Sequence, residues 1–423
     1  GEQIVLNLPS EIHNPADAVV ELSTRTAVFA PIKRGLQHIQ VRGFVFEHGA
    51  NQGPFPQSGI VSVRSGKNWL IENNCIRYAN TIGLDIGSQT WKGSALLEAQ
   101  ESDRKLIIGG EHIVRNNSVT DNGLCGIAGW NCGGSRIEGN QVLRNNRLGF
   151  RGGLNARWEE EAGIKLHACN GVVIEANVVQ DNDGAGIWLD NGFRGASIRR
   201  NLLRNNLGKG IFLELGDGPA TIHHNIVAYT RRATDFWAGH GVYAHDASGL
   251  TIAHNLLLNN AGHGVISKVV TNRTLGRDKH QVQSSRITIQ NNIFAGSGKA
   301  AISLPYPSSR AQDNTSDYNL FVGKARFSLN TNSGRVKAHV IEEQLEKDLM
   351  DHDPDGMEWP DPALSLMRAK ISHESWRRIV SWDTHSRNVS DTGTFLTGAV
   401  LHIKNVSEDW LLKSPVIDSI QQD

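Results

Sequence analysis

One short phrase recurs along the chain and constrains the fold more than any other feature. It consists of an apolar residue, two further residues, an Asn, a second apolar pair and a polar turn, followed by an apolar strand that opens with Gly. The tightest copies are 23 or 24 residues apart, a period typical of one coil of a parallel β-helix rather than of a helical solenoid. The sequence therefore predicts an all-β, right-handed parallel β-helix. The clearest copies begin at Ile137, Ile174, Ile198, Ile222, Ile252 and Ile289.

The asparagines of this phrase are predicted to form a ladder inside the solenoid. Asn tolerates the left-handed backbone of a sharp turn, and its amide can hydrogen-bond to the copy in the next coil. We therefore interpret these residues as structural rather than catalytic. They are Asn74, Asn117, Asn140, Asn177, Asn201, Asn225, Asn255 and Asn292.

The strands that open with Gly carry the candidate functional residues. Side chains alternate between the two faces of a strand, so Ile187 and Leu189 are predicted to point inward and their neighbours outward. One outward column then holds Lys165, Trp188, Phe212 and Tyr243, and the other holds Trp130, His167, Asp190, Glu214, His245 and Lys268.

Two acids in the second column form a candidate catalytic pair. Asp190 and Glu214 each stand four residues after the glycine that opens their strand, Gly186 and Gly210, so they share a register in adjacent coils. Parallel strands lie about 4.8 Å apart, which places the two carboxylates about 5 Å apart. That separation is typical of a retaining glycosidase, whereas inverting enzymes need about 6.5–9.5 Å. Acids held so close keep one member protonated and the other anionic. The alternative is a pair of solvated surface acids.

Aromatic and basic residues accompany the pair. We expect Trp188 and Phe212, two residues before the acids, to face solvent and to pack against the flat faces of sugar rings. His167 and His245 flank the pair, either as hydrogen-bonding groups or as plain surface imidazoles. The remaining substrate-binding candidates are Trp130, Lys165, Tyr243 and Lys268.

Two stretches resemble a known enzyme family. The first is GIWLDNG followed by GIFLELG, and the second is VFEHGANQGPFPQSGIVSVRSGKNWLIENNCIRYANTIGLDIG. Both are similar to the β-helix glycoside hydrolases of the family-120 β-xylosidase type. The resemblance extends from about Leu22 to Tyr318, and weakly to SWDTHSRN near Ser381. It implies that Asp190 is the nucleophile and Glu214 the acid/base of the hydrolase.

Two other functions remain open. A polysaccharide lyase removes a proton beside a uronate with a basic residue, and Lys165, His167, His245 and Lys268 are candidates for that role. A calcium-assisted lyase needs several clustered oxygen ligands, whereas this face offers two acids. A non-catalytic, carbohydrate-binding β-helix is the third possibility, because fold alone implies no chemistry.

The composition limits the kinds of molecule that we expect the chain to bind. The 43 basic and 43 acidic residues cancel, which disfavours nucleic acid and anionic membranes and favours a neutral oligosaccharide. No apolar run approaches the roughly 20 residues of a membrane span. We expect no cofactor or metal. Cys132 and Cys169 share a register that stacking could bridge, although we favour free thiols for all four cysteines.

The ends and insertions complete the organisation. We expect a β-helix over residues 1–323, with coils from about Lys33 to Leu320, and a cap over 324–423 in which Ile341, Leu345 and Leu349 form a helix face. The chain starts among apparent strands, so we expect missing N-terminal coils, or a partner chain or second copy covering this end. Long insertions bracket the active face and predict a pocket with exo action rather than an open groove, because they would block a polymer on at least one side. Its wall candidates are Trp158, Glu159, Glu160, Glu161, Asp235 and Trp237, with solvated loop charge as the default for the acids.

Overall fold

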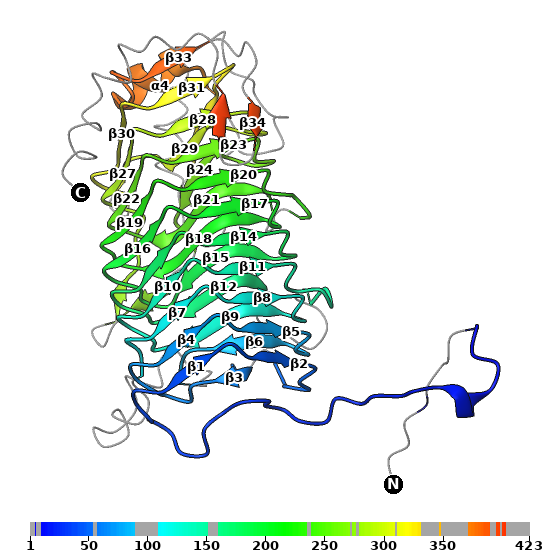
Figure 1. Cartoon of the computed structure of the whole chain (residues 1–423). Coiled ribbons are helices and arrows are strands. Elements are labelled where there is room, and N and C mark those ends of the chain that lie inside the picture. Colours follow the sequence, from blue (N-terminus) through cyan, green and yellow to red (C-terminus); the bar gives the residue numbers. More distant parts are fainter. Residues whose placement is uncertain are drawn as a thin grey trace.

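The computed structural model forms a solenoid of three long parallel sheets (Figure 1), which confirms the predicted right-handed parallel β-helix. Each coil contributes one strand to each sheet, and successive coils pair in parallel. The structure describes residues 5, 10–53, 57–88, 109–150, 160–234, 238–270, 273–275, 279–308, 311–330, 347, 371–389, 395–397 and 400–402.

The three sheets are named by their order along a coil. The first sheet contains β1 Gln40–Arg42, β4 Leu70–Glu72, β7 Ile113–Arg115, β10 Arg136–Glu138, β13 Val173–Glu175, β16 Ala196–Arg199, β19 Ala220–His223, β22 Leu250–Ala253, β27 Ile287–Gln290 and β30 Thr315–Asp317. The second contains β2 Val45–Glu47, β5 Cys75–Arg77, β8 Ser118–Thr120, β11 Gln141–Leu143, β14 Val178–Gln180, β17 Leu202–Arg204, β20 Ile226–Ala228, β23 Leu256–Leu258, β28 Ile293–Ala295, β31 Leu320–Val322 and β33 Arg387–Val389.

The third sheet carries the longest strands and the candidate site. It contains β3 Gly59–Ser62, β6 Ile82–Asp85, β9 Cys125–Trp130, β12 Ala162–His167, β15 Ala185–Asp190, β18 Lys209–Gly216, β21 His240–Ala247, β24 Val265–Lys268, β29 Ile302–Pro305 and β32 Phe327–Asn330. Two antiparallel hairpins lie outside the sheets, β25 Thr274–Leu275 with β26 His280–Gln281 and β34 Phe395–Thr397 with β35 Val400–His402.

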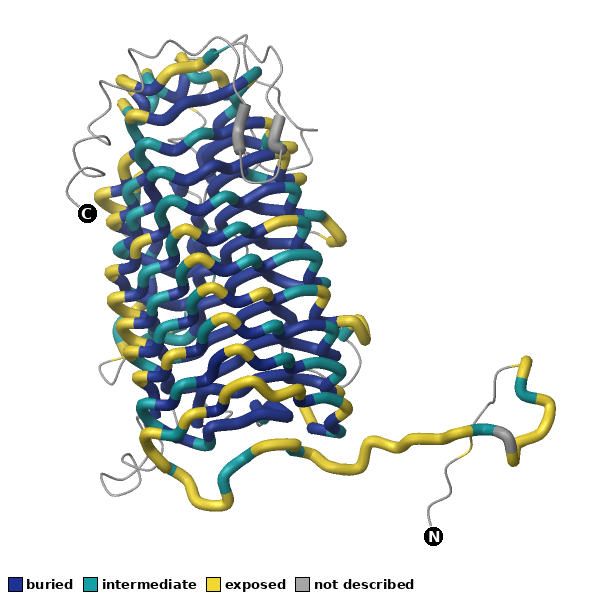
Figure 2. Tube along the Cα trace, viewed as in Figure 1, coloured by how far each residue is buried: buried dark blue, intermediate teal, exposed yellow. Residues whose placement is uncertain are grey.

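A continuous apolar core runs along the inside of the solenoid (Figure 2). Ile187 and Leu189 are fully buried in it, stacked in register between Ile164 and Leu166 of the preceding coil and Ile211 and Leu213 of the next. The predicted inward column is therefore confirmed. It follows that the intervening residues of these strands face outward.

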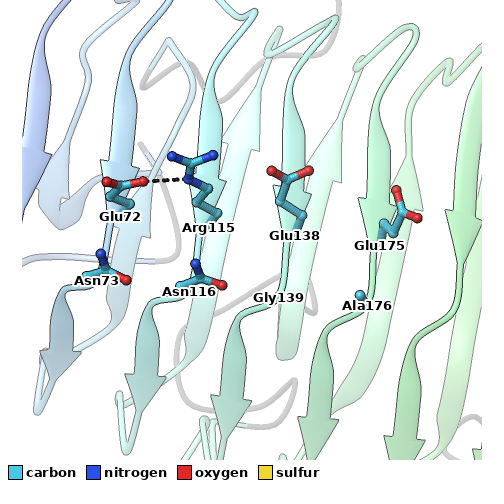
Figure 3. A pocket seen from close by; sticks show the side chains of 8 residues that line it. All are labelled: Glu72, Asn73, Arg115, Asn116, Glu138, Gly139, Glu175 and Ala176. Atoms are coloured by element: carbon cyan, nitrogen blue, oxygen red, sulfur yellow. Dashed lines mark hydrogen bonds and ion pairs between the residues drawn. The ribbon is translucent and has the colours of Figure 1, made fainter.

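The sharp turn between the first and second sheets differs from the prediction in one respect. The left-handed residue is the one before each ladder asparagine, as at Asn73, Asn116, Gly139 and Ala176, with φ of 56°, 55°, 65° and 53° (Figure 3). The ladder asparagine itself follows this turn and points its amide inward. The prediction that the ladder Asn adopts the left-handed backbone was therefore wrong by one position.

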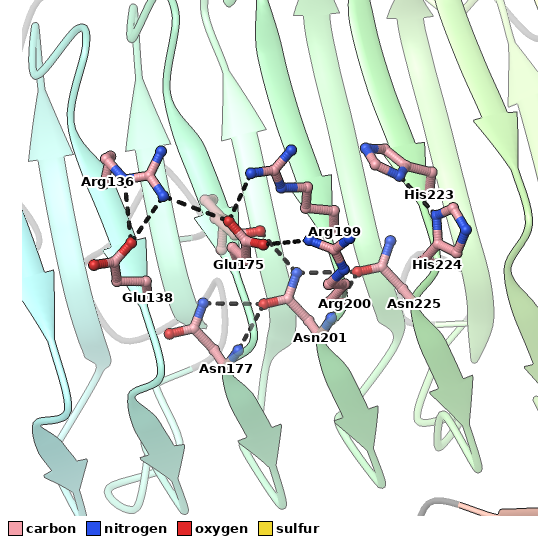
Figure 4. Close-up of polar contacts among 11 residues, drawn as sticks. Arg136, Glu138, Glu175, Asn177, Arg199, Arg200, Asn201, His223, His224 and Asn225 are labelled. Carbon is pink, nitrogen blue, oxygen red and sulfur yellow. Dashed lines mark hydrogen bonds and ion pairs between the residues drawn. The ribbon is translucent and has the colours of Figure 1, made fainter. Parts of the chain in front are cut away.

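The predicted asparagine ladder itself is confirmed. Asn201 accepts hydrogen bonds at Oδ1 from the backbone N–H of Asn177 at 2.9 Å and from its Nδ2 at 3.0 Å (Figure 4). Its own Nδ2 donates to the carbonyl of Ile174 at 2.9 Å and to Oδ1 of Asn225 at 3.0 Å. Each rung thus satisfies buried backbone groups that strand pairing leaves open. A second ladder that the sequence analysis did not single out runs beside the third sheet through Asn122, Asn145, Asn182 and Asn206.

Replacing Asn201 by Ala is expected to lower the free energy of unfolding by about 2–4 kcal/mol, because it leaves the N–H of Asn177 and the carbonyl of Ile174 buried and unpaired. Urea unfolding followed by circular dichroism measures the change. The matched control is Gln141→Ala, an exposed position on β11, which should change stability by no more than about 0.5 kcal/mol. Equal effects of the two changes would contradict a structural ladder.

A helix covers the C-terminal end of the core. α4 (His373–Val380) begins after Ser372, whose side chain accepts from the N–H of Ser375. Its Trp376 is fully buried, with its ring centre 5.0 Å from that of Phe327 on the last strand of the third sheet. This contact closes the solenoid, and β32 lies beyond the boundary predicted at residue 323. The helix face predicted at Ile341, Leu345 and Leu349 lies outside the described residues.

The N-terminal segment runs away from the solenoid (Figures 1 and 2) and contains the short 3-10 helix η1 (Pro15–Asp17). It joins the body where Phe29 bridges to Val61 beneath the third sheet. Several apolar side chains of this end are exposed, among them Val19, Leu22 and Ile32.

Candidate functional site

The outer face of the third sheet is not open to solvent as the sequence analysis expected. Trp188 and Phe212 are only 2% and 0% exposed. The Phe212 ring lies between the rings of Trp188 and Tyr243, with centre separations of 4.5 and 5.0 Å. Because aromatic side chains stack along a column at the strand spacing, they cover one another's faces. The expectation that Trp188 and Phe212 face solvent was therefore wrong.

Asp190 lies in a polar cluster at the end of β15. Its Oδ2 lies 3.6 Å from Nζ of Lys165 and 3.4 Å from Nδ1 of His167, both on β12 of the preceding coil. Its Oδ1 accepts from the backbone N–H of Asn191 at 2.6 Å. The Lys165 ammonium also lies 3.0 Å from the centre of the Trp188 ring. These contacts hold Asp190 on the outer face, opposite the inward Leu189.

Glu160 belongs to the same cluster, although the default expectation for the acidic run was solvated charge. Glu160 and Glu161 are both buried. Glu160 binds Lys165 at 3.1 Å and Nε2 of His167 at 2.9 Å, and it accepts from Nε2 of Gln57 at 2.9 Å. The expectation failed because the ammonium of Lys165 and the imidazole of His167, both on the outer face of β12, stand opposite the acid. The other wall candidates, Trp158, Glu159, Asp235 and Trp237, lie outside the described residues.

Glu214 stands one coil farther along and has a different set of partners. Its Oε1 lies 2.7 Å from Nη2 of Arg273, a residue that the sequence analysis did not identify. Arg273 also lies 3.6 Å from Oδ2 of Asp246. Asp246 is fully buried, 3.2 Å from Nε2 of His245, and accepts from the N–H of Val270 at 2.8 Å. The pair is thus flanked by Lys165 and His167 on one side, and by Arg273 and His245 on the other.

The two acids differ in their proton affinity. Burial, and next the negative charge of Glu214, raise the pKa of Asp190 to about 6. Burial also acts to raise the pKa of Glu214, but the opposing charges of His245 and Arg273 outweigh it and lower that pKa. For Glu160, too, burial is outweighed, by Lys165 and His167, and its pKa is lowered. In this arrangement, Asp190 is the member of the pair that more readily takes a proton.

Asp190→Asn is expected to stabilise the protein increasingly as the pH rises from 4 to 8. The folded-state pKa of about 6 exceeds the unfolded value of about 3.9. Folding therefore favours the protonated acid, and the wild type loses stability as the pH rises through 6. The gain from Asn should be near zero at pH 4 and about 2–3 kcal/mol at pH 8, measured by urea unfolding. A gain that does not vary with pH would contradict this.

Three buried polar atoms around the cluster have no hydrogen-bond partner among the described residues. They are Oε1 of Gln57, Nε1 of Trp130 and Nδ1 of His245. Trp130 stacks on His167, with ring centres 4.0 Å apart and planes at 4°. A buried unpaired donor or acceptor costs about 1–3 kcal/mol, and unpaired groups of this kind are a common feature of ligand sites. Both histidines are therefore buried members of the cluster rather than surface imidazoles.

The remaining candidates lie at the margins of the cluster. Tyr243 and Lys268 are on β21 and β24, with Lys268 in register with His245. Beyond Trp130 and His167, Cys132 and Cys169 form a disulfide between successive coils. The preference for free thiols was wrong for these two cysteines, because stacking brings their shared register into contact. Cys75 and Cys125 are free.

A groove of about 520 Å³ lies elsewhere, on the outer face of the first sheet (Figure 3). Its Glu138 and Glu175 share a register in adjacent coils, as the candidate pair does. Arg136, however, lies between them, 3.0 Å from Glu138 and 3.5 Å from Glu175 (Figure 4). Burial is outweighed at Glu175 by Arg199 and Arg200, which lower its pKa. Glu175 is therefore disposed to stay ionised, and Arg136 occupies the space between it and Glu138.

Within the described part of the chain, no group of three or more His, Cys, Asp or Glu side chains is arranged to hold a metal ion. Nor does that part contain a helix long and apolar enough to cross a membrane.

Comparison with known proteins supports the fold. Residues 58–257 match the family model described as right handed beta helix region. The solved structure described as the complex of XylC with xylose is similar, with 23% identity and a TM-score of 0.56. The match covers 73% of this chain and 54% of that one, so the chain corresponds to about half of that protein's length. At this identity the likeness establishes a shared β-helix fold.

Two more distant solved structures also match. The periplasmic alginate epimerase AlgG is 16% identical, with a TM-score of 0.42 and coverage of 68% of this chain and 73% of that one. A tailspike protein double mutant of E. coli bacteriophage HK620, in complex with a pentasaccharide, is 10% identical, with a TM-score of 0.44 and coverage of 68% and 58%. The comparison with curated proteins yields no match.

Proposed function

We propose that this chain is a retaining, exo-acting glycoside hydrolase of β-xylosidase type that cleaves plant-type oligosaccharides. The observation that carries the proposal is the pair formed by the buried Asp190 and by Glu214, whose side chain is 12% exposed, on successive strands, with a raised pKa at Asp190 and a lowered pKa at Glu214. Parallel strand spacing predicts carboxyl carbons about 4.5–6.5 Å apart, which suits a double displacement through a covalent intermediate.

The roles of the two acids follow from the family resemblance. Asp190 attacks the anomeric carbon, and Glu214 protonates the leaving oxygen and then activates water. The backbone N–H of Asn191 and the side chains of Lys165 and His167 hold Asp190 in a fixed direction. A nucleophile positioned in this way loses little freedom on reaching the transition state.

The polar atoms around the pair suit a sugar. Gln57 and His245 contribute an acceptor and a ring nitrogen that lack partners among the described residues, and Trp130 contributes an indole N–H. Sugar hydroxyls donate and accept, so they complement such a mixed set. The XylC structure, similar in fold, was solved with xylose, and a pentose is accordingly the first sugar to test. The insertions around this face favour a pocket and hence release of terminal sugars.

A panel of chromogenic glycosides tests the proposal. We expect the protein to hydrolyse an aryl β-xyloside. The first product should keep the anomeric configuration of the substrate, which proton NMR measures. An oligosaccharide should release single sugars from one end. Internal fragments as first products would contradict exo action, and an inverted product would contradict the double displacement.

A polysaccharide lyase is the second candidate, because Lys165 and His167 lie within 3.6 Å of Asp190. A lyase base must reach the proton beside the uronate, whereas the Lys165 side chain is 1% exposed, with Nζ 3.1 Å from Glu160 and 3.0 Å from the centre of the Trp188 ring. An unsaturated product that absorbs ultraviolet light would favour the lyase. Sugar binding that survives loss of both acids, without any turnover, would favour a non-catalytic β-helix.

A further inference from the structure

Arg273 reaches the carboxylate pair from the insertion between the third and first sheets. Its side chain is 35% exposed, whereas that of Glu214, with which it forms a 2.7 Å ion pair, is 12% exposed. The guanidinium therefore covers the more accessible acid of the pair from the solvent side. A general acid passes its proton to the leaving group, so Arg273 borders the region where the leaving group would lie.

The carboxylate of Asp246 also lies near the guanidinium of Arg273. Oδ2 of Asp246 lies 3.6 Å from Nη2 of Arg273. Asp246 is fully buried and fixed by the N–H of Val270. Arg273 can therefore exchange Glu214 for Asp246 with a small movement of its side chain, and its charge stays paired in either position.

Because other charges surround Glu214, the exchange of its ion-pair partner affects the protonation of the acid pair. Asp190 faces Glu214 from β15, Lys165 from β12, Tyr243 and His245 from β21, and Arg273 from the insertion. Burial opposes ionisation of Glu214, and the charges of His245 and Arg273 reverse that effect. With Arg273 in place, Asp190, whose pKa burial and the charge of Glu214 raise to about 6, is the acid of the pair that more readily holds a proton. A nucleophilic Asp190 requires the opposite distribution.

We propose, on the basis of the proposed function, that Arg273 is a positioning residue that determines which acid of the pair carries the shared proton. In contact with Glu214, it keeps the proton on Asp190. When acceptor oxygens of a leaving-group sugar and Asp246 engage the guanidinium, the proton passes from the Asp190 carboxyl to the Glu214 carboxylate. No other atom is exchanged in this step. Asp190 is then an anionic nucleophile and Glu214 a general acid. Binding of the leaving-group sugar thus brings the pair into the protonation state that cleavage requires.

Carboxyl titration tests the proposal without requiring activity. Protein labelled with ¹³C at Asp and Glu carboxyls is titrated by NMR, and Asp190→Asn and Glu214→Gln spectra assign the two signals. In the wild type, Asp190 should titrate at the higher pH. In Arg273→Gln, the Glu214 midpoint should rise by about one unit or more and the Asp190 midpoint should fall. Arg273→Lys should keep the wild-type order.

The matched control is Arg286→Gln, because Arg286 pairs with Asp217 at 3.1 Å, an acid outside the pair. This control should titrate as the wild type does. Unchanged midpoints in Arg273→Gln, in a protein that melts as the wild type does, would overturn the proposal. A shift in the control as large as that in Arg273→Gln would also overturn it. Failure of the glycoside panel with shifted midpoints would overturn the proposed function and leave the control of proton position by Arg273 standing.

Kinetics provide the second readout. Arg273→Gln should lower kcat/KM for a disaccharide by about 10- to 100-fold, because it removes a charged hydrogen bond to the leaving group. For an aryl glycoside with an acidic phenol, which lacks hydroxyls that could engage Arg273, the variant should react at least as fast as the wild type, because Asp190 is then already the anionic member of the pair. Equal losses on both substrates would show a merely structural role and overturn the proposal.

Discussion

Replacing Asp190 by Asn is expected to lower kcat/KM for every glycoside substrate by at least about 10⁴-fold, because no covalent intermediate forms without a nucleophile. Asn matches Asp in size and can still accept the 2.6 Å hydrogen bond from the N–H of Asn191. The loss should therefore reflect chemistry rather than a distorted strand. Steady-state rates with an aryl glycoside and with a disaccharide measure it.

The matched control for this change is Asp181→Asn, at the turn after β14, where Asp181 accepts hydrogen bonds from Gln180 and Asn205. It removes one carboxylate from a coil without touching the pair and should leave both rates unchanged. Thermal unfolding of Asp190→Asn should begin no lower than in the wild type. A variant that retains a tenth or more of wild-type activity would place the chemistry at another site.

The repetitive parts of this chain could be predicted from sequence because each coil repeats the same local pattern. Alternation along GIWLD placed Ile187 and Leu189 in the core, and they are fully buried there. The spacing of the ladder asparagines predicted hydrogen bonds that Asn177 and Asn201 make. Both features depend on the strand period and on stacking of identical residues, which the sequence encodes directly.

The insertions could not be predicted in the same way, because their residues have no register with neighbouring coils. From such segments, Glu160 contacts Lys165 and His167, and Arg273 contacts Glu214 and Asp246. Lys165 and His167, two basic residues on the outer face of β12, were a signal that an acid accompanies them. For Arg273 we find no comparable signal, since a single exposed loop arginine resembles many others. The exposure of Trp188 was misjudged because alternation gives the direction of a side chain and not what covers it.

The electrostatics of the pair bear on the roles that the family resemblance implies. Asp190 has the raised pKa and Glu214 the lowered one in this structure. A resting nucleophile is anionic and a resting general acid is protonated, so the observed order is the reverse of the implied roles. Contact with Arg273 accounts for part of this difference, because it stabilises the anionic form of Glu214. Identification of the nucleophile therefore needs an experiment that traps the step after bond cleavage.

Azide provides that experiment, with Glu214→Ala as the variant. Loss of the general acid should abolish turnover of disaccharides while sparing aryl glycosides with acidic phenols, whose oxygen leaves without a proton. Hydrolysis of the intermediate then becomes slow, because water lacks a general base. A small anion needs none, so azide should accelerate turnover by about 10²-fold or more. The product should be a glycosyl azide with the original anomeric configuration, identified by NMR.

The matched control is Glu214→Gln, which fills the space that azide would enter and should respond much less to it. Azide that instead gives an inverted product with Glu214→Ala and a retained product with Asp190→Ala would exchange the two roles. In that case, azide takes the place of Glu214 as the missing nucleophile and attacks the substrate directly, in a single displacement. The raised pKa of Asp190 and the ion pair of Glu214 with Arg273 favour that exchange, whereas the family resemblance opposes it. If the roles are exchanged, the proton distribution of the resting pair also holds during catalysis. If they are not, Arg273 imposes that distribution only in the resting protein. The configuration of the azide product decides between these two cases.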